Sequence, residues 1–218
     1  MFNSNQWKTN ILQTGLTCYY PGTTNLIISV PHGGEMRPPF IADRQRPDSG
    51  KLKELTKEEV RLRREGSDPD EDTAGRITTA ADIYTQEMGL AVAREYCRLT
   101  GLRPHLIMCN LHRSKLDANR PLVTAAEDPL AQQVYAEYHA FLELAKTEVG
   151  RGLLLDLHGQ NHQQNSIELG YLYKRAELNG GNLLETGTSV ASMLRRNGLT
   201  ANQLVAGEGK GSLFTFLQ

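Results

Sequence analysis

The sequence predicts an α/β fold in which helices flank a mainly parallel sheet. Three short runs, mostly apolar and rich in aliphatic residues, have the character of buried strands at 25–30, 105–109 and 152–158. Two longer stretches with apolar residues at helical spacing, 79–98 and 128–148, lie between these runs. Strands that alternate with long helices are typical of a parallel sheet, because each parallel connection needs a crossover.

The first predicted strand, 25–30, is followed directly by Pro31. A proline cannot donate a hydrogen bond to a sheet ladder, so we expect this strand to end there. Downstream, the stretch 43–76 is dense in charged residues, among them Arg44, and contains few apolar ones. We therefore expect a solvated loop and helix in that stretch, most simply a surface excursion and alternatively a cover over a site.

The two long helices have recognisable ends. Gly101 follows the first helix as a stop signal, while the second begins near Pro129 and ends before Gly150. A fourth strand is predicted at 166–173, from its aliphatic and aromatic residues.

Two further helices, 183–197 and 212–218, are predicted at the end of the chain. The length fits a single domain over residues 1–218. The last helix stops without a cap or a following strand. We therefore expect the domain to be truncated at its C-terminus.

Composition excludes several classes of function. The chain has 24 basic and 25 acidic residues, a net charge of −1, so it has no field that would attract nucleic acid or a membrane surface. Its three cysteines have no Cys-x-x-Cys spacing, which indicates reduced thiols. The first twenty residues lack a continuous apolar stretch. We expect a cytoplasmic protein.

A metal site is the strongest functional feature of the sequence. His32 and Glu35 are separated by two glycines, which could form a tight turn that lets both side chains reach one cation. His158 is the last residue of the strand predicted at 152–158, and we expect it at the same sheet edge, since open α/β sheets gather ligands at strand carboxyl ends. Two histidines and one carboxylate, with a position left for water, are typical of catalytic zinc.

Alternative interpretations of these residues stay open at this point. A single histidine after a strand is more often a hydrogen-bonded polar residue than a metal ligand. Asp156, two residues before His158 and on the same strand face, could orient that histidine as an outer carboxylate. His139 falls within a predicted helix, and we expect it to be an ordinary packed or exposed residue.

The loop after the strand at 105–109 is rich in basic and amide side chains. The guanidinium group of an arginine can donate two parallel hydrogen bonds to a carboxylate. Arg113 and Arg120 are therefore candidates for binding an acidic ligand. Asp117 could brace one of them. The alternative is that these are surface charges, with Asp117 paired to an arginine only to order the loop.

Three motifs together resemble the N-formylglutamate amidohydrolase family, which is related to the zinc carboxypeptidases. They are Ser-Val-Pro-His-Gly-Gly at 29–34, the segment 110–121, and Asp-Leu-His-Gly at 156–159. They occur in the family's order and span most of the chain. Asp82, with Thr85 and Glu87, also resembles the start of a helix in that family.

The resemblance implies a three-layer αβα fold of the phosphorylase/hydrolase type, with a mainly parallel mixed sheet. It implies Zn²⁺ on His32, Glu35 and His158, and hydrolysis of N-formyl-L-glutamate to formate and L-glutamate. In this scheme Asn119 and Arg120 hold a carboxylate of this small acidic N-acyl amino acid.

The remaining catalytic roles are less defined by the motifs. Arg113 would polarise the scissile carbonyl or bind a second carboxylate. The related carboxypeptidases use a glutamate beyond the last zinc histidine as general base. In this chain Glu168 is the best carboxylate available for that role, with a structural role as the alternative.

Two other functions remain compatible with these residues. The first is a carboxypeptidase-like metallohydrolase or an N-acyl amino acid deacylase that uses the same metal. The second belongs to another class: an inactive relative that binds a metal and acidic ligands without turnover.

Overall fold

The computed structural model describes residues 14–45, 77–160, 167, 169–173, 175–181 and 183–206. The chain divides into two compact units, 1–161 and 162–218. Each unit is described by itself below.

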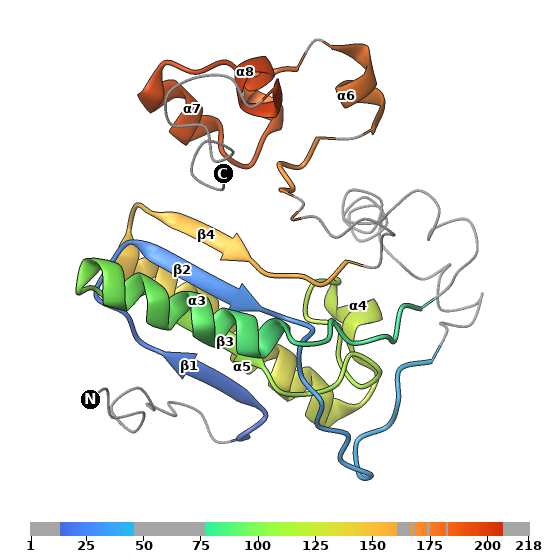
Figure 1. The fold of residues 1–218 in the computed structure, drawn as a ribbon. Coiled ribbons are helices and arrows are strands. Elements are labelled where there is room, and N and C mark those ends of the chain that lie inside the picture. The colour runs from blue at the N-terminus through green and yellow to red at the C-terminus, as the bar shows by residue number, and fades with distance from the viewer. Residues whose placement is uncertain are drawn as a thin grey trace. The chain divides into compact units, whose positions relative to one another are not determined.

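The first unit is built on a four-stranded mixed sheet (Figure 1). Its strands are β1 (Thr17–Tyr20), β2 (Leu26–Val30), β3 (His105–Cys109) and β4 (Leu153–Asp156), in the spatial order β1-β3-β2-β4. Strand β2 pairs in parallel with β3 and β4, whereas β1 runs antiparallel to β3. The α/β fold and the presence of the three strands predicted in this unit are therefore confirmed. The third strand was predicted to be buried, which was wrong: β4 lies at the edge of the sheet, and half-buried and exposed side chains alternate along it.

Strand β1 was not predicted, and its sequence explains why. It has only four residues, Thr-Cys-Tyr-Tyr, in which fully buried and half-buried side chains alternate. It lies at the edge of the sheet. Such a short edge strand lacks the continuous apolar run by which the buried strands β2 and β3 stand out.

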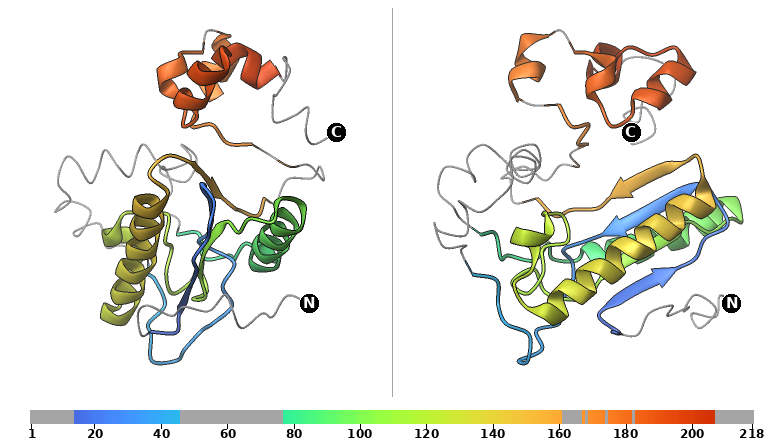
Figure 2. Two further views of the ribbon diagram at one scale, coloured as in Figure 1. Left: turned by 90° about the vertical axis from the view of Figure 1, so that its left-hand side faces the viewer. Right: turned by 180° about the vertical axis from the view of Figure 1, so that it is seen from behind.

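Two long helices cover opposite faces of the sheet (Figure 2). They are α3 (Thr85–Thr100) and α5 (Pro129–Val149), and the short helix α4 (Leu122–Ala125) precedes α5. Successive strand residues point to opposite faces. Ile27 and Ile107 accordingly pack in the cluster that contains the side chains of α5, while Ile28 and Leu106 pack with Ala93 of α3.

Helix α3 begins later than its sequence predicts. Residues 79–82 form no helical turn, and the backbone N–H of Asp82 donates instead to the carbonyl oxygen of His32 at 3.0 Å. Tyr84 then adopts a left-handed conformation, φ 65°, at the start of the helix. This segment places an acidic side chain directly beside the end of β2.

Arg44 is the described residue at which the prediction of a solvated stretch was wrong. Its side chain is buried and donates hydrogen bonds to the carbonyl oxygens of Thr78, Arg113 and Thr124. These bonds connect the segment before α3, the loop after β3 and helix α4. Residues 46–76, the rest of the predicted excursion, lie outside the described residues.

The second unit contains only short helices among its described residues. They are α6 (Arg175–Gly180), the 3-10 helix η3 (Glu185–Gly187), α7 (Ala191–Asn197) and α8 (Ala201–Ala206). Leu194, Ala201 and Leu204 form its buried core. The predicted helix 183–197 is therefore split in two, and the predicted helix 212–218 lies outside the described residues.

The strand predicted at 166–173 was wrong for the residues that are described there. Residues 167 and 169–173 form no strand. Leu172 has a left-handed backbone, φ 66°, which is incompatible with extended strand geometry. The aliphatic residues that suggested a strand include Ile167 and Leu172, both of which are exposed.

All three cysteines are free thiols, as expected. No helix of the described residues is both long and apolar enough to cross a membrane.

Candidate metal centre

The carboxyl ends of three parallel strands meet at one edge of the sheet, as predicted. In the register of β2 and β4, Ser29 lies opposite Asp156, and the backbone N–H of Leu157 donates to the carbonyl oxygen of Ser29 at 2.8 Å. His32 and His158 follow these two residues by a few positions. Strand pairing therefore brings together two histidines that are far apart in the sequence.

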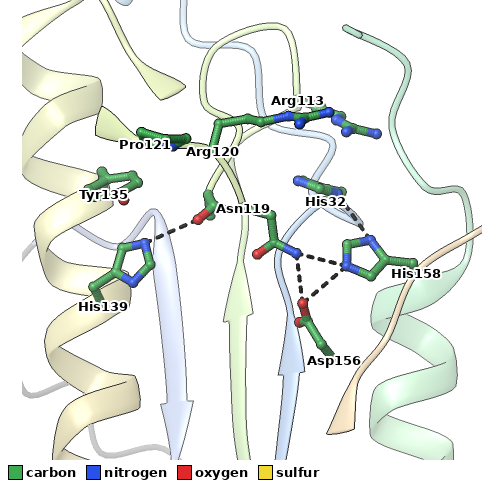
Figure 3. Close-up of a pocket in the computed structure, with 10 residues that line it drawn as sticks. His32, Arg113, Asn119, Arg120, Pro121, Tyr135, His139, Asp156 and His158 are labelled. Atoms are coloured by element: carbon green, nitrogen blue, oxygen red, sulfur yellow. Dashed lines mark hydrogen bonds and ion pairs between the residues drawn. The ribbon is translucent and has the colours of Figure 1, made fainter. Parts of the chain in front are cut away.

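Three side chains at this edge could hold a metal ion: His32, Asp82 and His158. Their candidate ligand atoms all lie within 4.8 Å of one another. The two Nδ1 atoms are 3.2 Å apart, and Asp82 Oδ2 lies 3.0 Å from Nδ1 of His158 and 3.5 Å from Nδ1 of His32. Figure 3 shows the two imidazoles side by side at the wall of a pocket.

Asp82 is held in this group by contacts to the two segments that carry the histidines. Besides its backbone bond to His32, its carboxylate accepts a hydrogen bond from the backbone of Gly159. A Cβ atom at Gly159 would lie 3.2 Å from Cβ of Asp82, so the two chains are in close contact there. The glycine after His158 thus allows the segment before α3 to approach.

Each histidine also has a carboxylate at its other ring nitrogen. His32 Nε2 lies 2.6 Å from Asp117 Oδ1, and His158 Nε2 lies 3.1 Å from Asp156 Oδ2. Ionised carboxylates only accept hydrogen bonds, so the contact with Asp117 places a proton on Nε2 of His32. His158 has a carboxylate at each nitrogen, Asp82 at Nδ1 and Asp156 at Nε2, so a metal ion at Nδ1 would replace a proton there. With a metal ion bound at both Nδ1 atoms, the two Nε2 atoms would face carboxylates, as is common for metal-bound histidines.

The carboxylates of the centre stabilise a positive charge between them. Burial alone would lower the pKa of His158, but hydrogen bonds to Asp156 and Asp82, and their charges, raise it to about 9. Burial acts to raise the pKa of Asp82, yet hydrogen bonds from His158 and His32 hold it well below its usual range. Without a metal ion, the proton on His158 balances the negative charge of the nearby carboxylates. A divalent cation bound to the same side chains would do the same.

Glu35 does not belong to this group of three. It is exposed, and its charge acts on the pKa of His112 instead. The glycines before it serve close packing: a Cβ atom at Gly33 would lie 2.4 Å from Thr85 Oγ1, and one at Gly34 would lie 2.3 Å from the backbone carbon of Asn110. His-Gly-Gly thus packs the end of β2 against α3 and the loop after β3, and Asp82 supplies the carboxylate of the group.

A cavity of about 650 Å³ adjoins the centre, and the side chains predicted to bind substrate line it. Arg113, Asn119 and Arg120 line it together with His32 and His158 (Figure 3). Asn119 donates its amide N–H to Asp156 Oδ2 at 2.7 Å and lies 2.8 Å from His158 Nε2. The loop after β3 and the two histidines therefore form one continuous wall.

Asp117 connects His32 to the arginines. Arg113 Nε lies 3.0 Å from its carboxylate, Arg44 at 3.6 Å and Arg120 at 3.9 Å. Burial would raise the pKa of Asp117, but the hydrogen bond with His32 and the charges of His32, Arg113 and Arg44 lower it well below its usual range. Asp117 thus contacts an arginine, as the sequence suggested, and also His32, which the sequence did not indicate.

Two further residues of helix α5 line the cavity. They are Tyr135 and His139, four positions apart and hence on one helical face. The expectation that His139 is an ordinary helix residue overlooked this position. Its i, i+4 spacing with a tyrosine was the available signal, but the spacing alone does not tell which helical face lines a cavity. Glu168, the predicted general base, lies outside the described residues.

Comparisons with protein-family models, with curated proteins and with solved structures gave no match. The resemblance to the N-formylglutamate amidohydrolases therefore stays a prediction from the motifs.

Proposed function

We propose that this chain is a zinc-dependent hydrolase that cleaves the amide bond of an N-acyl acidic amino acid. The reaction suggested by the motifs converts N-formyl-L-glutamate and water to formate and L-glutamate. One observation carries the proposal: the His32, Asp82 and His158 group adjoins a cavity that two arginines also line. The corresponding fold would be a three-layer αβα arrangement of the phosphorylase/hydrolase type.

The donor set supports zinc as the metal. Two histidines and one carboxylate, with room for a further ligand, are typical of catalytic zinc sites. Such an ion would polarise the amide carbonyl and lower the pKa of a water molecule. In this scheme Asp117 and Asp156 keep the imidazoles oriented through their Nε2 protons.

The arginines would position the substrate. Arg120 would bind a carboxylate of the amino acid half, with Asn119 beside it, and Arg113 would bind a second carboxylate or polarise the scissile carbonyl. Both arginines are within 4 Å of Asp117, so their guanidinium groups are restrained before a ligand arrives. Restrained anchors hold the amide close to the metal-binding side chains and lower the entropic cost of reaching the reactive geometry.

A base must also take the proton of the attacking water. We propose Glu168 for this role, on the basis of its place after His158 in the sequence. Glu168→Gln should then lower kcat by at least about a hundredfold, the usual contribution of general-base catalysis, while zinc binding is retained.

The deciding experiment measures zinc content and formate release on the same zinc-loaded full chain. His158→Ala should lose both zinc and activity, because it removes a metal ligand. His112→Gln is the matched control: His112 bonds Arg37 and Ser114 and does not line the cavity, so zinc should be retained. Stoichiometric zinc in His158→Ala would contradict the metal assignment.

The same assay separates the alternatives. Release of acetate from N-acetyl substrates, or of amino acids from peptides, in preference to formate would favour the deacylase or the carboxypeptidase-like function. Binding of N-formyl-L-glutamate by the zinc-loaded protein, with no formate released over hours, would identify an inactive relative.

A further inference from the structure

The cavity beside the metal centre has two chemically different walls. One is polar and consists of His32, Arg113, Asn119, Arg120, Asp156 and His158. The other, called the apolar wall below, consists of Ala118, Pro121, Tyr135 and His139. In Figure 3, Pro121, Tyr135 and His139 lie across the pocket from His158 and Asp156. A ligand that fills the cavity thus meets a charged surface on one side and rings on the other.

The rings of the apolar wall are fixed in place. Tyr135 and His139 are one helical turn apart on α5, with ring centroids 4.2 Å apart. Tyr138 packs edge-on against His139 from within the core at 5.6 Å. His139 Nε2 lies 3.1 Å from the carbonyl oxygen of Ala118. A wall ordered before binding loses little conformational entropy when a ligand packs on it.

His139 contributes no charge to this wall. A carbonyl oxygen only accepts, so the contact with Ala118 makes Nε2 the protonated nitrogen. The hydrogen bond to Ala118 acts to raise the pKa of His139, but burial outweighs it and lowers the pKa below its ordinary value, which favours the neutral imidazole at pH 7. The wall therefore favours an uncharged planar group over a second carboxylate.

N-formyl-L-glutamate would leave the apolar wall without a partner. It carries two carboxylates and a formamide, which match the arginines and the metal-binding side chains but not the rings. A volume of about 650 Å³ also lies within the range of cavities that hold larger small-molecule ligands. Contact between aromatic rings is favourable beyond the apolar area that it buries.

We propose that the ligand of this site is an N-acyl amino acid that carries an aromatic ring, and that the ring packs against Tyr135 and His139. Its carboxylate then lies on Arg113 and Arg120, with its amide toward His32 and His158. The inference rests on the proposed hydrolysis of an N-acyl amino acid at this site, and it replaces N-formyl-L-glutamate by a larger substrate that carries a ring. The ring belongs either to the acyl group or to the side chain of the amino acid.

Two matched pairs of compounds distinguish these sources. N-benzoyl-L-glutamate against N-acetyl-L-glutamate varies the acyl group, and N-formyl-L-phenylalanine against N-formyl-L-leucine varies the side chain. Binding to the zinc-loaded full chain is measured by calorimetry, with release of the free acids followed in parallel samples. In at least one pair, the compound with the ring should bind about ten-fold more tightly.

Variants of Tyr135 and His139 test whether these side chains cause the tighter binding of the compounds with a ring. Tyr135→Leu should abolish the ten-fold difference and leave N-formyl-L-glutamate binding unchanged, and His139→Leu gives an independent test if the first variant is unstable. Tyr96→Leu is the matched control, because Tyr96 is a half-buried tyrosine on α3 that does not line the cavity. Tyr96→Leu should retain the ten-fold difference in binding between the compounds of the pair.

The outcomes are separable from those of the proposed function. Equal binding within both pairs, or a preference that survives in both leucine variants of the apolar wall, would overturn the inference. Tight binding of the ring compounds without hydrolysis would contradict the proposed reaction and leave the inference standing.

Discussion

His32 Nε2 lies 2.6 Å from Asp117 Oδ1, and each of these residues is only 1% exposed. This contact connects the candidate metal ligand at the end of β2 with the loop that carries Arg113 and Arg120. The orientation of the imidazole and the position of the arginines therefore depend on the same buried carboxylate.

Asp117→Asn should weaken zinc binding about 10- to 100-fold. The asparagine oxygen can still accept from His32, but the negative charge that makes the imidazole a better ligand is lost. Competition with a chelating dye measures the affinity, and thermal unfolding of the metal-free protein shows whether the variant is folded.

Asp43→Asn is the control for that variant. Asp43 is exposed and bonds Ser114 and Lys115, away from both histidines. Its loss should leave zinc affinity unchanged. Equal affinities of the wild type and Asp117→Asn would contradict the role given to the His32 contact.

Asp82→Asn and Glu35→Gln together identify the carboxylate of the metal site. The geometry places Asp82 Oδ2 3.0 Å from His158 Nδ1, so Asp82→Asn should lose zinc at least about a hundredfold in affinity, whereas Glu35→Gln should retain it. Zinc content after dialysis, measured by atomic emission, distinguishes them. The opposite result would restore the ligand set predicted from the sequence.

Gly34→Ala should destabilise the first unit by about 1–3 kcal/mol, as overpacking does, and should weaken zinc binding. A Cβ atom there would lie 2.3 Å from the backbone of Asn110, so the end of β2 and the loop after β3 must separate. Urea unfolding measures the change. Gly180→Ala, with nothing within 4 Å of its Cβ, should leave that transition unchanged.

His105 should make stability fall as the pH drops below about 6.5, the ordinary pKa of histidine. Burial lowers the pKa of His105, outweighing the charge of Glu148, so the folded state disfavours the protonated form. A depressed folded pKa contributes stability above the unfolded value, and this contribution is lost as the pH falls toward the folded one.

The measurement is the free energy of unfolding of metal-free protein from pH 8 to 5. His105→Gln keeps a neutral group near the hydroxyl of Tyr19, which lies 2.7 Å from His105 Nδ1. The wild type should lose more stability than this variant over that range. Parallel profiles would contradict the prediction, and the other histidines cancel in the difference.

The buried elements of the first unit were predictable because their signals are local. Strand β3 has the predicted bounds, and α5 begins at Pro129 with Asp128 as its side-chain cap. The predicted strand at 166–173 was wrong in its described part because an apolar run alone does not show whether its side chains become buried. Leu172 is 74% exposed.

Some residues of the candidate site were predicted from the sequence, and others were not. His32 and His158 were identified because both come at the ends of apolar runs that predict strands, and parallel strands end at one sheet edge. The segment that contains Arg113, Asn119 and Arg120 was found by its composition and lines the cavity. Tyr135 and His139 were not found, since helical spacing does not identify which face lines a cavity.

Local sequence patterns were enough to identify the strand ends, the two histidines near them and the basic loop between these histidines. The positions of Asp82 beside both histidines and of Asp117 behind His32 became visible only in the folded chain. Local patterns could not identify Asp82 because it is 50 residues from His32 and 76 from His158. Its place depends on how α3 packs on the sheet and on the close contacts that Gly33 and Gly159 permit.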